Sequence, residues 1–158
     1  MIKIGIYKGY LRGDGKHASS KFKNGKALLK FETVRKEDSY VGILSEDYIV
    51  FDVDNWPDAK ALLRILDDLR LGFSALETNH GIHFYFKGYD LTANKIGWYT
   101  PIGVKADFKL GTKNTADPLR IDGKTRKWIR KASNPDPLPK WLLPLSNHQN
   151  YIDDIQDG

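Results

Sequence analysis

An apolar stretch that ends in two aspartates, residues 48–55, constrains the fold of this chain more than any other feature. Its first part is aromatic and β-branched, and apolar residues occupy both alternating positions, as in a strand that is buried on both faces. Asp52 and Asp54 alternate with Val53, so a strand projects both carboxylates to the same side. Because two close carboxylates repel each other unless a cation lies between them, the pair predicts a divalent-metal site. A strand that runs into a capped helix is the alternative, and it explains Asp54 but not Asp52.

A helix is predicted directly after the two aspartates. Asn55 can cap its N-terminus, Pro57 suits its first turn, and Gly72 is the expected stop. Between these residues, apolar side chains recur at helical spacing from Ala59 to Leu69. Strands are predicted around this helix, at residues 40–44, 48–53, 73–78, 82–86, 104–110, 118–121 and 126–129. Several strands around one long helix predict an α+β domain.

The chain ends are expected to contain less regular structure. Residues 11–27 are basic and rich in Gly and Ser, which is typical of a loop. Residues 134–139 are rich in proline, and the residues that follow are polar and end in acids, which indicates a boundary. We therefore expect one domain over residues 1–145 and a polar tail, or a linker to a further region, over residues 146–158.

The composition of the chain restricts its chemistry. It has no cysteine, which excludes disulfides, thiolate zinc sites, iron–sulfur clusters and cysteine nucleophiles. No apolar run approaches the roughly 20 residues of a membrane span. The N-terminal residues also lack the apolar segment of a signal peptide. These features predict a cytoplasmic protein without a membrane partner.

Positive charge is concentrated in two parts of the chain. The net charge is +6 over residues 1–40 and +7 over residues 91–131, whereas residues 41–90 carry −5. Basic surface favours nucleic acid, because neutralising phosphates releases counterions. The side chains expected to contact a nucleic-acid strand are Lys21, Lys23, Lys26, Lys124, Arg126 and Arg130. An unevenly charged soluble surface explains the same pattern without a ligand.

Two further polar residues are candidates for binding a metal ion or phosphate. Asp107 lies between Lys105 and Lys109 on one face of a predicted strand, and hard cations such as Mg²⁺ take carboxylate oxygens. His83 opens an aromatic strand after a turn that contains Gly81, where turn amides, an imidazole and a lysine can hold phosphate oxygens. A surface acid paired with lysines and a structural histidine are the plainer interpretations of these two residues.

Three motifs occur in order along the chain: an apolar strand that ends in Asp-x-Asp, a Gly turn with x-His before an aromatic strand, and a strand with an aspartate after an apolar residue. This order resembles the catalytic domain of the archaeo-eukaryotic primase superfamily, especially the primase-polymerase domains of phage, plasmid and mobile-element replication proteins. The resemblance covers residues 40–129. It implies an α+β fold with an RRM-like catalytic sheet and a smaller N-terminal α/β unit, and it makes residues 1–145 the primase-polymerase catalytic domain.

The resemblance implies a metal-dependent DNA primase or polymerase that transfers nucleotides from NTPs or dNTPs on a template. Asp52, Asp54 and Asp107 match the acids that hold two Mg²⁺ or Mn²⁺ ions, and His83 matches the histidine at the incoming triphosphate. The other residues expected at the nucleotide are Thr78, Gly81, Lys87 and Lys109. The implied partners are a single-stranded DNA template with its primer, the nucleotide, and a helicase domain or protein.

The sequence departs from the family pattern at the turn before His83 and also fits two other functions. His80-Gly81 stands where relatives often carry a Gly-Gly pair, so we expect the loop at the triphosphate to differ in shape. A non-catalytic module that binds single-stranded nucleic acid would use the basic segments and aromatic strands, but it does not need three acids on one face. A metal-dependent nuclease could use the same acids.

Overall fold

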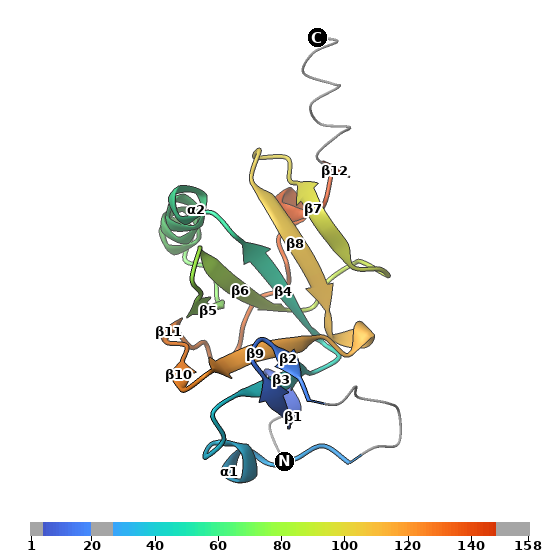
Figure 1. Ribbon diagram of the computed structural model, residues 1–158. Helices are drawn as coiled ribbons and strands as arrows, with labels where there is room; N and C mark the ends of the chain where they lie inside the picture. Colours follow the sequence, from blue (N-terminus) through green and yellow to red (C-terminus); the bar gives the residue numbers. More distant parts are fainter. Residues whose placement is uncertain (1–4, 20–26, 148–158) are drawn as a thin grey trace. The chain divides into compact units, whose positions relative to one another are not determined.

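The computed structural model describes residues 5–19 and 27–147 (Figure 1). The chain divides into two compact units, and each unit combines two separate segments of the chain. Unit 1 comprises Met1–Tyr48 and Leu110–Lys127, and unit 2 comprises Ile49–Lys109 and Trp128–Gly158. Each unit is built on one sheet with few helices, in agreement with the predicted α+β class.

Unit 1 is built on a five-stranded sheet. Its elements are β1 (Tyr7–Asp14), β2 (His17–Ala18), α1 (Phe31–Val34), β3 (Tyr40–Leu44), the 3-10 helix η1 (Gly111–Lys113), β9 (Ala116–Ile121) and β10 (Lys124–Thr125). The strand order is β10-β9-β3-β1-β2, and the neighbouring strands pair antiparallel. Leu11 of β1 packs with Val41 and Ile43 of β3 in a small core, which Ala18 and Leu28 flank.

Unit 2 is built on a seven-stranded sheet and one long helix. Its elements are β4 (Tyr48–Val53), α2 (Trp56–Asp68), β5 (Ser74–Glu77), β6 (Ile82–Lys87), β7 (Lys95–Tyr99), β8 (Lys105–Leu110), β11 (Trp128–Arg130), the 3-10 helix η2 (Lys140–Leu142) and β12 (Ser146–Asn147). The strand order is β11-β5-β6-β4-β8-β7-β12. β4 is therefore central, and every residue in it except Asp52 is buried, which confirms the prediction of a buried central strand.

The strands predicted at residues 40–44, 73–78, 82–86, 104–110 and 118–121 are also confirmed, with small shifts at their ends. β7 was not predicted. Gly97 adopts a φ of 68° in the middle of this strand, and the pairing with β8 shifts register there, so polar and apolar side chains do not alternate regularly along it. This segment is a strand because it pairs with β8, and the sequence pattern does not reveal such pairing.

The loop expected over residues 11–27 is wrong in its first part. Residues 11–14 continue β1 and residues 17–18 form β2, while residues 20–26 lie outside the described part of the chain. The buried positions of β1 are Gly9 and Leu11. With a glycine and a single leucine facing inward, β1 shows little apolar alternation, so its pattern did not predict a strand.

The strand predicted at residues 126–129 is confirmed only in its second half, as β11 at Trp128–Arg130, and a separate short strand, β10, precedes it at Lys124–Thr125. Asp122 (φ 47°) and Gly123 (φ 85°) form a two-residue turn, and β10 after it pairs with β9 in unit 1. β11 then pairs with β5 in unit 2. Positive φ at both turn residues suits the twist of a hairpin, which confirms the turn predicted around Gly123.

Five phenylalanines form the centre of the unit 2 core. Their side chains are all fully buried, and they are Phe51, Phe73, Phe84, Phe86 and Phe108. The rings of Phe51 and Phe108 meet edge to face with centroids 5.0 Å apart, and the centroids of Phe51 and Phe84 are 6.4 Å apart. Because side chains alternate along a strand, β4, β6 and β8 turn Phe51, Phe84, Phe86 and Phe108 to one face of the sheet and their neighbours to the other.

Helix α2 begins as predicted and ends earlier than predicted. The Asn55 side chain accepts a hydrogen bond from the backbone N–H of Asp58 at 3.0 Å, and Pro57 lies in the first turn. The helix ends at Asp68, where Arg70 adopts a left-handed φ of 57° and the N–H of Leu71 bonds the carbonyl of Leu66. This closure is a Schellman motif, so Gly72 is not the stop.

Gly72 has a different role from the one predicted. Its N–H donates to the Asp136 carboxylate at 2.6 Å, and its carbonyl accepts from the N–H of Asp136 at 2.9 Å. These bonds join the end of the helical segment to the proline-rich segment near the C-terminus. No helix among residues 5–19 and 27–147 is long and apolar enough to cross a membrane.

Replacing Asn55 by alanine should lower the free energy of unfolding by about 1 kcal/mol, because the N–H of Asp58 loses its side-chain acceptor. Urea unfolding monitored by far-UV circular dichroism measures the change. Asn55→Ser, which restores an acceptor oxygen, is the control and should recover most of the stability. Equal stability of the alanine variant and the wild type would contradict a stabilising cap.

Candidate functional site

The candidate site is centred on the Asp52 carboxylate, near the end of the central strand β4. His83 on β6 places its Nε2 3.3 Å from Oδ2 of Asp52, and Lys109 on β8 places its Nζ 3.6 Å from the same oxygen. β6 and β8 are the two strands that flank β4 (Figure 1). Three strands therefore each contribute one charged or polar side chain to one point on the sheet.

These three side chains lie on the face opposite the phenylalanine core. Phe51, Phe84 and Phe108 each neighbour one residue of the site in sequence, so alternation turns Asp52, His83 and Lys109 the other way. The side chains of Asp52 and His83 are only 13% and 8% exposed, whereas that of Lys109 is 33% exposed. The site is a nearly buried acid–imidazole pair with a more accessible ammonium beside it.

The environment of Asp52 keeps its carboxylate charged. Burial raises the pKa of Asp52, but the hydrogen bond and charge of His83, followed by those of Lys109, outweigh burial and lower the pKa below its usual value. The carboxylate is therefore ionised at neutral pH. A negative charge held in this way is available to bind a cation or to orient the imidazole.

The turn before β6 places His83 next to Asp52. In this turn the N–H of Thr78 bonds the carbonyl of Gly81 at 3.0 Å, and the N–H of Gly81 bonds Oγ1 of Thr78 at 3.1 Å. A Cβ on Gly81 would lie 1.8 Å from the backbone carbonyl oxygen of Val53. Only glycine allows the turn to lie this close to the end of β4.

The amide of Gly81 therefore has a partner inside the turn. Thr78 and Gly81 were expected to hold phosphate oxygens, and in the structure the N–H of Gly81 bonds Oγ1 of Thr78. Gly81 also permits the close backbone approach that sets the position of His83. The glycine itself was a usable signal for this role, because glycine is the residue that permits a close approach of the backbone.

The other two predicted metal ligands are placed differently from Asp52. Asp107 lies on β8 on the same face as Lys109, and its Oδ1 accepts a hydrogen bond from the backbone N–H of Gly97 at 2.8 Å. Asp54 follows the end of β4 and is exposed. Within the part of the chain that the structure describes, no three His, Asp or Glu side chains form a group that could hold a metal ion.

The structure does not bring Lys87 to this site. Lys87 shares the face of His83 but lies four residues along β6, which corresponds to about 13 Å at a strand rise of about 3.3 Å per residue. Its backbone N–H bonds the carbonyl of Asp136. Of the two lysines predicted at the nucleotide, only Lys109 approaches Asp52.

The residues predicted to contact nucleic acid fall into three groups. Lys124 and Arg126 belong to unit 1, where Arg126 donates to the carbonyl of Pro118 at 3.0 Å and Lys124 is exposed. Arg130 belongs to unit 2, where it forms an ion pair with Asp67 and lies over the ring of Phe73. The remaining three lie outside the described residues, namely Lys21, Lys23 and Lys26.

Comparison of the chain with protein-family models, curated proteins and solved structures found no match.

Two features near the site were not predicted from the sequence. Gly97 holds the Asp107 carboxylate through its backbone amide, and no side-chain pattern could have indicated this bond. Trp56 lines a groove beside α2 together with Lys60 and Leu63. These three residues are spaced four and three positions apart, so they share one face of the helix, beside the face of the buried Ala59, Leu62 and Leu66. This spacing was a usable signal for the groove.

Proposed function

We propose that unit 2 carries a metal-dependent nucleotidyl-transfer site of the primase-polymerase kind that the motifs resemble. In this proposal the protein extends a primer on single-stranded DNA from NTPs or dNTPs, during replication of a phage, plasmid or mobile element. A helicase domain or protein acts with it in the cytoplasm of the host cell. The observation that carries the proposal is the ionised Asp52 carboxylate between His83 and Lys109 on one sheet face.

The mixture of charges in the site suits a nucleotide bound with a cation. A carboxylate attracts a divalent ion but repels phosphate, whereas an imidazole and an ammonium attract phosphate. Asp52, His83 and Lys109 provide both kinds of group within 3.6 Å of one carboxylate oxygen. A surface that only binds a single strand does not require an ionised, nearly buried acid at its centre.

The acids present fit Mg²⁺ or Mn²⁺ in their chemistry. Mg²⁺ takes hard oxygen ligands and usually combines one or two carboxylates with water and substrate phosphates, so three preassembled protein ligands are not required. Asp52 and Asp107 lie on neighbouring strands and the same sheet face, and Asp54 follows directly after β4. When bound, such an ion stabilises the charge that develops on phosphate oxygens during transfer.

The side chains of this protein would act mainly by positioning. His83 and Lys109 would donate hydrogen bonds to phosphate oxygens, and the phosphate would compete with Asp52 for the imidazole N–H and the ammonium. Because β4, β6 and β8 are neighbouring strands of one sheet, their pairing would keep these donors in place before the nucleotide arrives. Phosphoryl transfer depends largely on such positioning and on charge stabilisation.

Incorporation of labelled dNTPs on a primed single-stranded template, first with Mg²⁺ and then with Mn²⁺, tests the proposal. Template-dependent primer extension by the full chain is the expected result. Shortening of an end-labelled primer or template in the same reaction instead would identify a nuclease. Binding of the strand with neither extension nor shortening would identify a non-catalytic module, and either outcome would overturn the proposal.

Replacing His83 by alanine should weaken the binding of a dNTP by about tenfold or more, because a charged phosphate loses a hydrogen-bond donor. Binding of Mn²⁺ alone should be nearly unchanged. Isothermal titration with dATP and, separately, with Mn²⁺ measures both effects. His80→Ala is the matched control, since His80 is an exposed histidine of the same turn. A parallel loss of Mn²⁺ affinity in the His83 variant would show that His83 is a metal ligand.

A further inference from the structure

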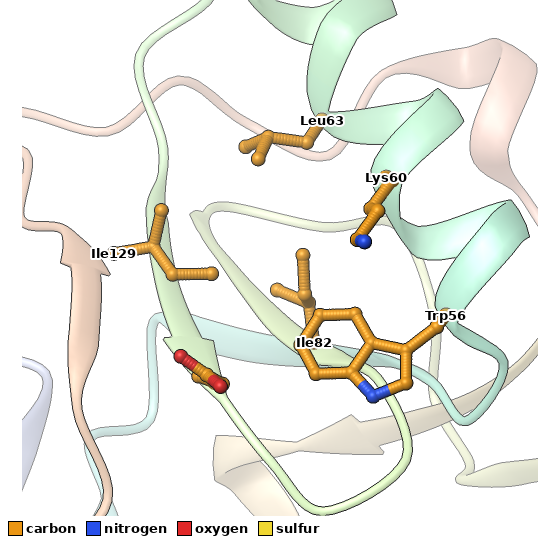
Figure 2. Close-up of a pocket in the computed structure, with 6 residues that line it drawn as sticks. Trp56, Lys60, Leu63, Ile82 and Ile129 are labelled. Atoms are coloured by element: carbon orange, nitrogen blue, oxygen red, sulfur yellow. The ribbon is translucent and has the colours of Figure 1, made fainter.

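A groove with a volume of about 540 Å³ lies between α2 and the strands at one side of the unit 2 sheet. Figure 2 shows Trp56, Lys60 and Leu63 along α2, facing Ile82 and Ile129 across the groove. Glu77 of β5 completes the lining. We call this hollow the Trp56 groove, and its volume falls within the range of small-molecule binding sites.

The lining of the groove is apolar with one charge of each sign. Ile82 is buried, Ile129 is 42% exposed, and the indole of Trp56 is half-buried and offers a flat aromatic surface. The ammonium of Lys60 lies 5.5 Å from the centroid of the Trp56 ring. A ligand that fits this lining is flat and largely apolar on its faces.

The charges decide which part of a nucleotide can enter the groove. Glu77 carries a carboxylate, so a phosphate placed inside the groove would be repelled. Lys60 is an exposed lysine on the helix, where it can reach a phosphate that stays outside. The cation–π contact between Lys60 and Trp56 is weak at an exposed position, so an incoming ring can displace the ammonium.

Residues that line the groove are also close in sequence to residues of the candidate site. Trp56 follows Asp54 by two residues, and Ile82 directly precedes His83. Glu77 and Ile82 are paired residues of the β5–β6 hairpin. Because Ile82 and His83 alternate on β6, the groove and the site use opposite faces of the same strand end.

We propose that the Trp56 groove binds one unpaired base of a single-stranded nucleic acid, stacked on the Trp56 indole with its phosphates beside Lys60. Aromatic side chains bind bases in this way without strong sequence preference. That the strand is the template of the proposed reaction rests on the proposed function, whereas binding of the base does not.

The test compares two labelled strands of equal length, about ten nucleotides. One carries bases and the other is an abasic sugar-phosphate strand of the same charge. Affinities are measured by fluorescence anisotropy with the full chain, in EDTA and without nucleotide. The wild type should bind the base-bearing strand about tenfold more tightly than the abasic strand.

Trp56→Leu should remove most of this difference in affinity, because it should weaken the binding of the base-bearing strand only. Trp56→Phe keeps an aromatic ring at the start of α2 and should retain most of the difference. Trp98→Leu is the matched control, because Trp98 also has a lysine over its ring, Lys95 at 4.7 Å, and lies outside the groove. Lys60→Ala should weaken the binding of both strands by the same factor, since both carry phosphates.

Equal affinity of the wild type for the two strands would overturn the proposal, as would an equal effect of Trp56→Leu on both. Asp52→Asn should leave the preference for the base-bearing strand unchanged, because Asp52 does not line the groove. Absence of primer extension by the wild type, with its preference for the base-bearing strand intact, would count against the proposed function alone.

Discussion

Replacing Asp52 by asparagine should reduce nucleotide incorporation by at least about 100-fold. The substitution keeps the size of the side chain but removes the charge that the proposed site needs for a divalent ion. It also changes the partner of His83 and Lys109, which both lie within 3.6 Å of the Asp52 carboxylate. The loss should therefore appear in the rate of incorporation and also in the affinity for Mn²⁺.

Single-turnover primer extension with saturating dNTP measures the effect of this substitution on chemistry. Asp68→Asn is the matched control, because Asp68 is an exposed aspartate of α2 and its replacement removes the same charge. Thermal unfolding of both variants shows whether the fold is retained. Incorporation by Asp52→Asn at the rate of the control would rule out a catalytic role for this acid.

Replacing Gly81 by alanine should lower the free energy of unfolding by about 3 kcal/mol. The added Cβ would lie 1.8 Å from the carbonyl oxygen of Val53, 2.9 Å from its carbonyl carbon and 3.1 Å from the backbone N of Asn55. All three are backbone atoms, so no side chain can turn aside to make room. Either the turn or the end of β4 has to move.

Chemical unfolding compares this variant with Gly5→Ala, where the added Cβ would have no atom within 4 Å. The control should change the stability by less than about 0.5 kcal/mol. The Gly81 variant should also lose dNTP affinity, because the turn that moves carries His83 away from Asp52. Wild-type stability in Gly81→Ala would show that the two segments do not pack this closely in solution.

The contact between Gly81 and Val53 joins two parts of the chain that the proposed function needs together. β4 supplies the carboxylate and β6 supplies the imidazole, and these strands are neighbours in the sheet. A displaced turn would lengthen the 3.3 Å separation between the two groups. Stability and activity are therefore expected to fall together at this glycine, whereas at Asp52 the fall in activity should be the larger effect.

The amino-acid sequence alone determined the features that depend on local patterns. The apolar run before Asp52 indicated a buried central strand, because burial on both faces excludes polar residues from either alternating position. Asn55 and Pro57 indicated the start of α2, because a cap and a first-turn proline act within a few residues. Such signals were sufficient for most strands and for the α+β class.

Only the tertiary structure decided which residues meet. The 3.6 Å approach of Lys109 to Asp52, the bond between Gly97 and Asp107 and the lining of the Trp56 groove all depend on strand order and register. The same holds for β1, which becomes a strand by pairing with β3 despite its weak alternation. These contacts join residues that are distant in the chain. A local sequence pattern does not show which distant residues pair, or how much their pairing stabilises a strand.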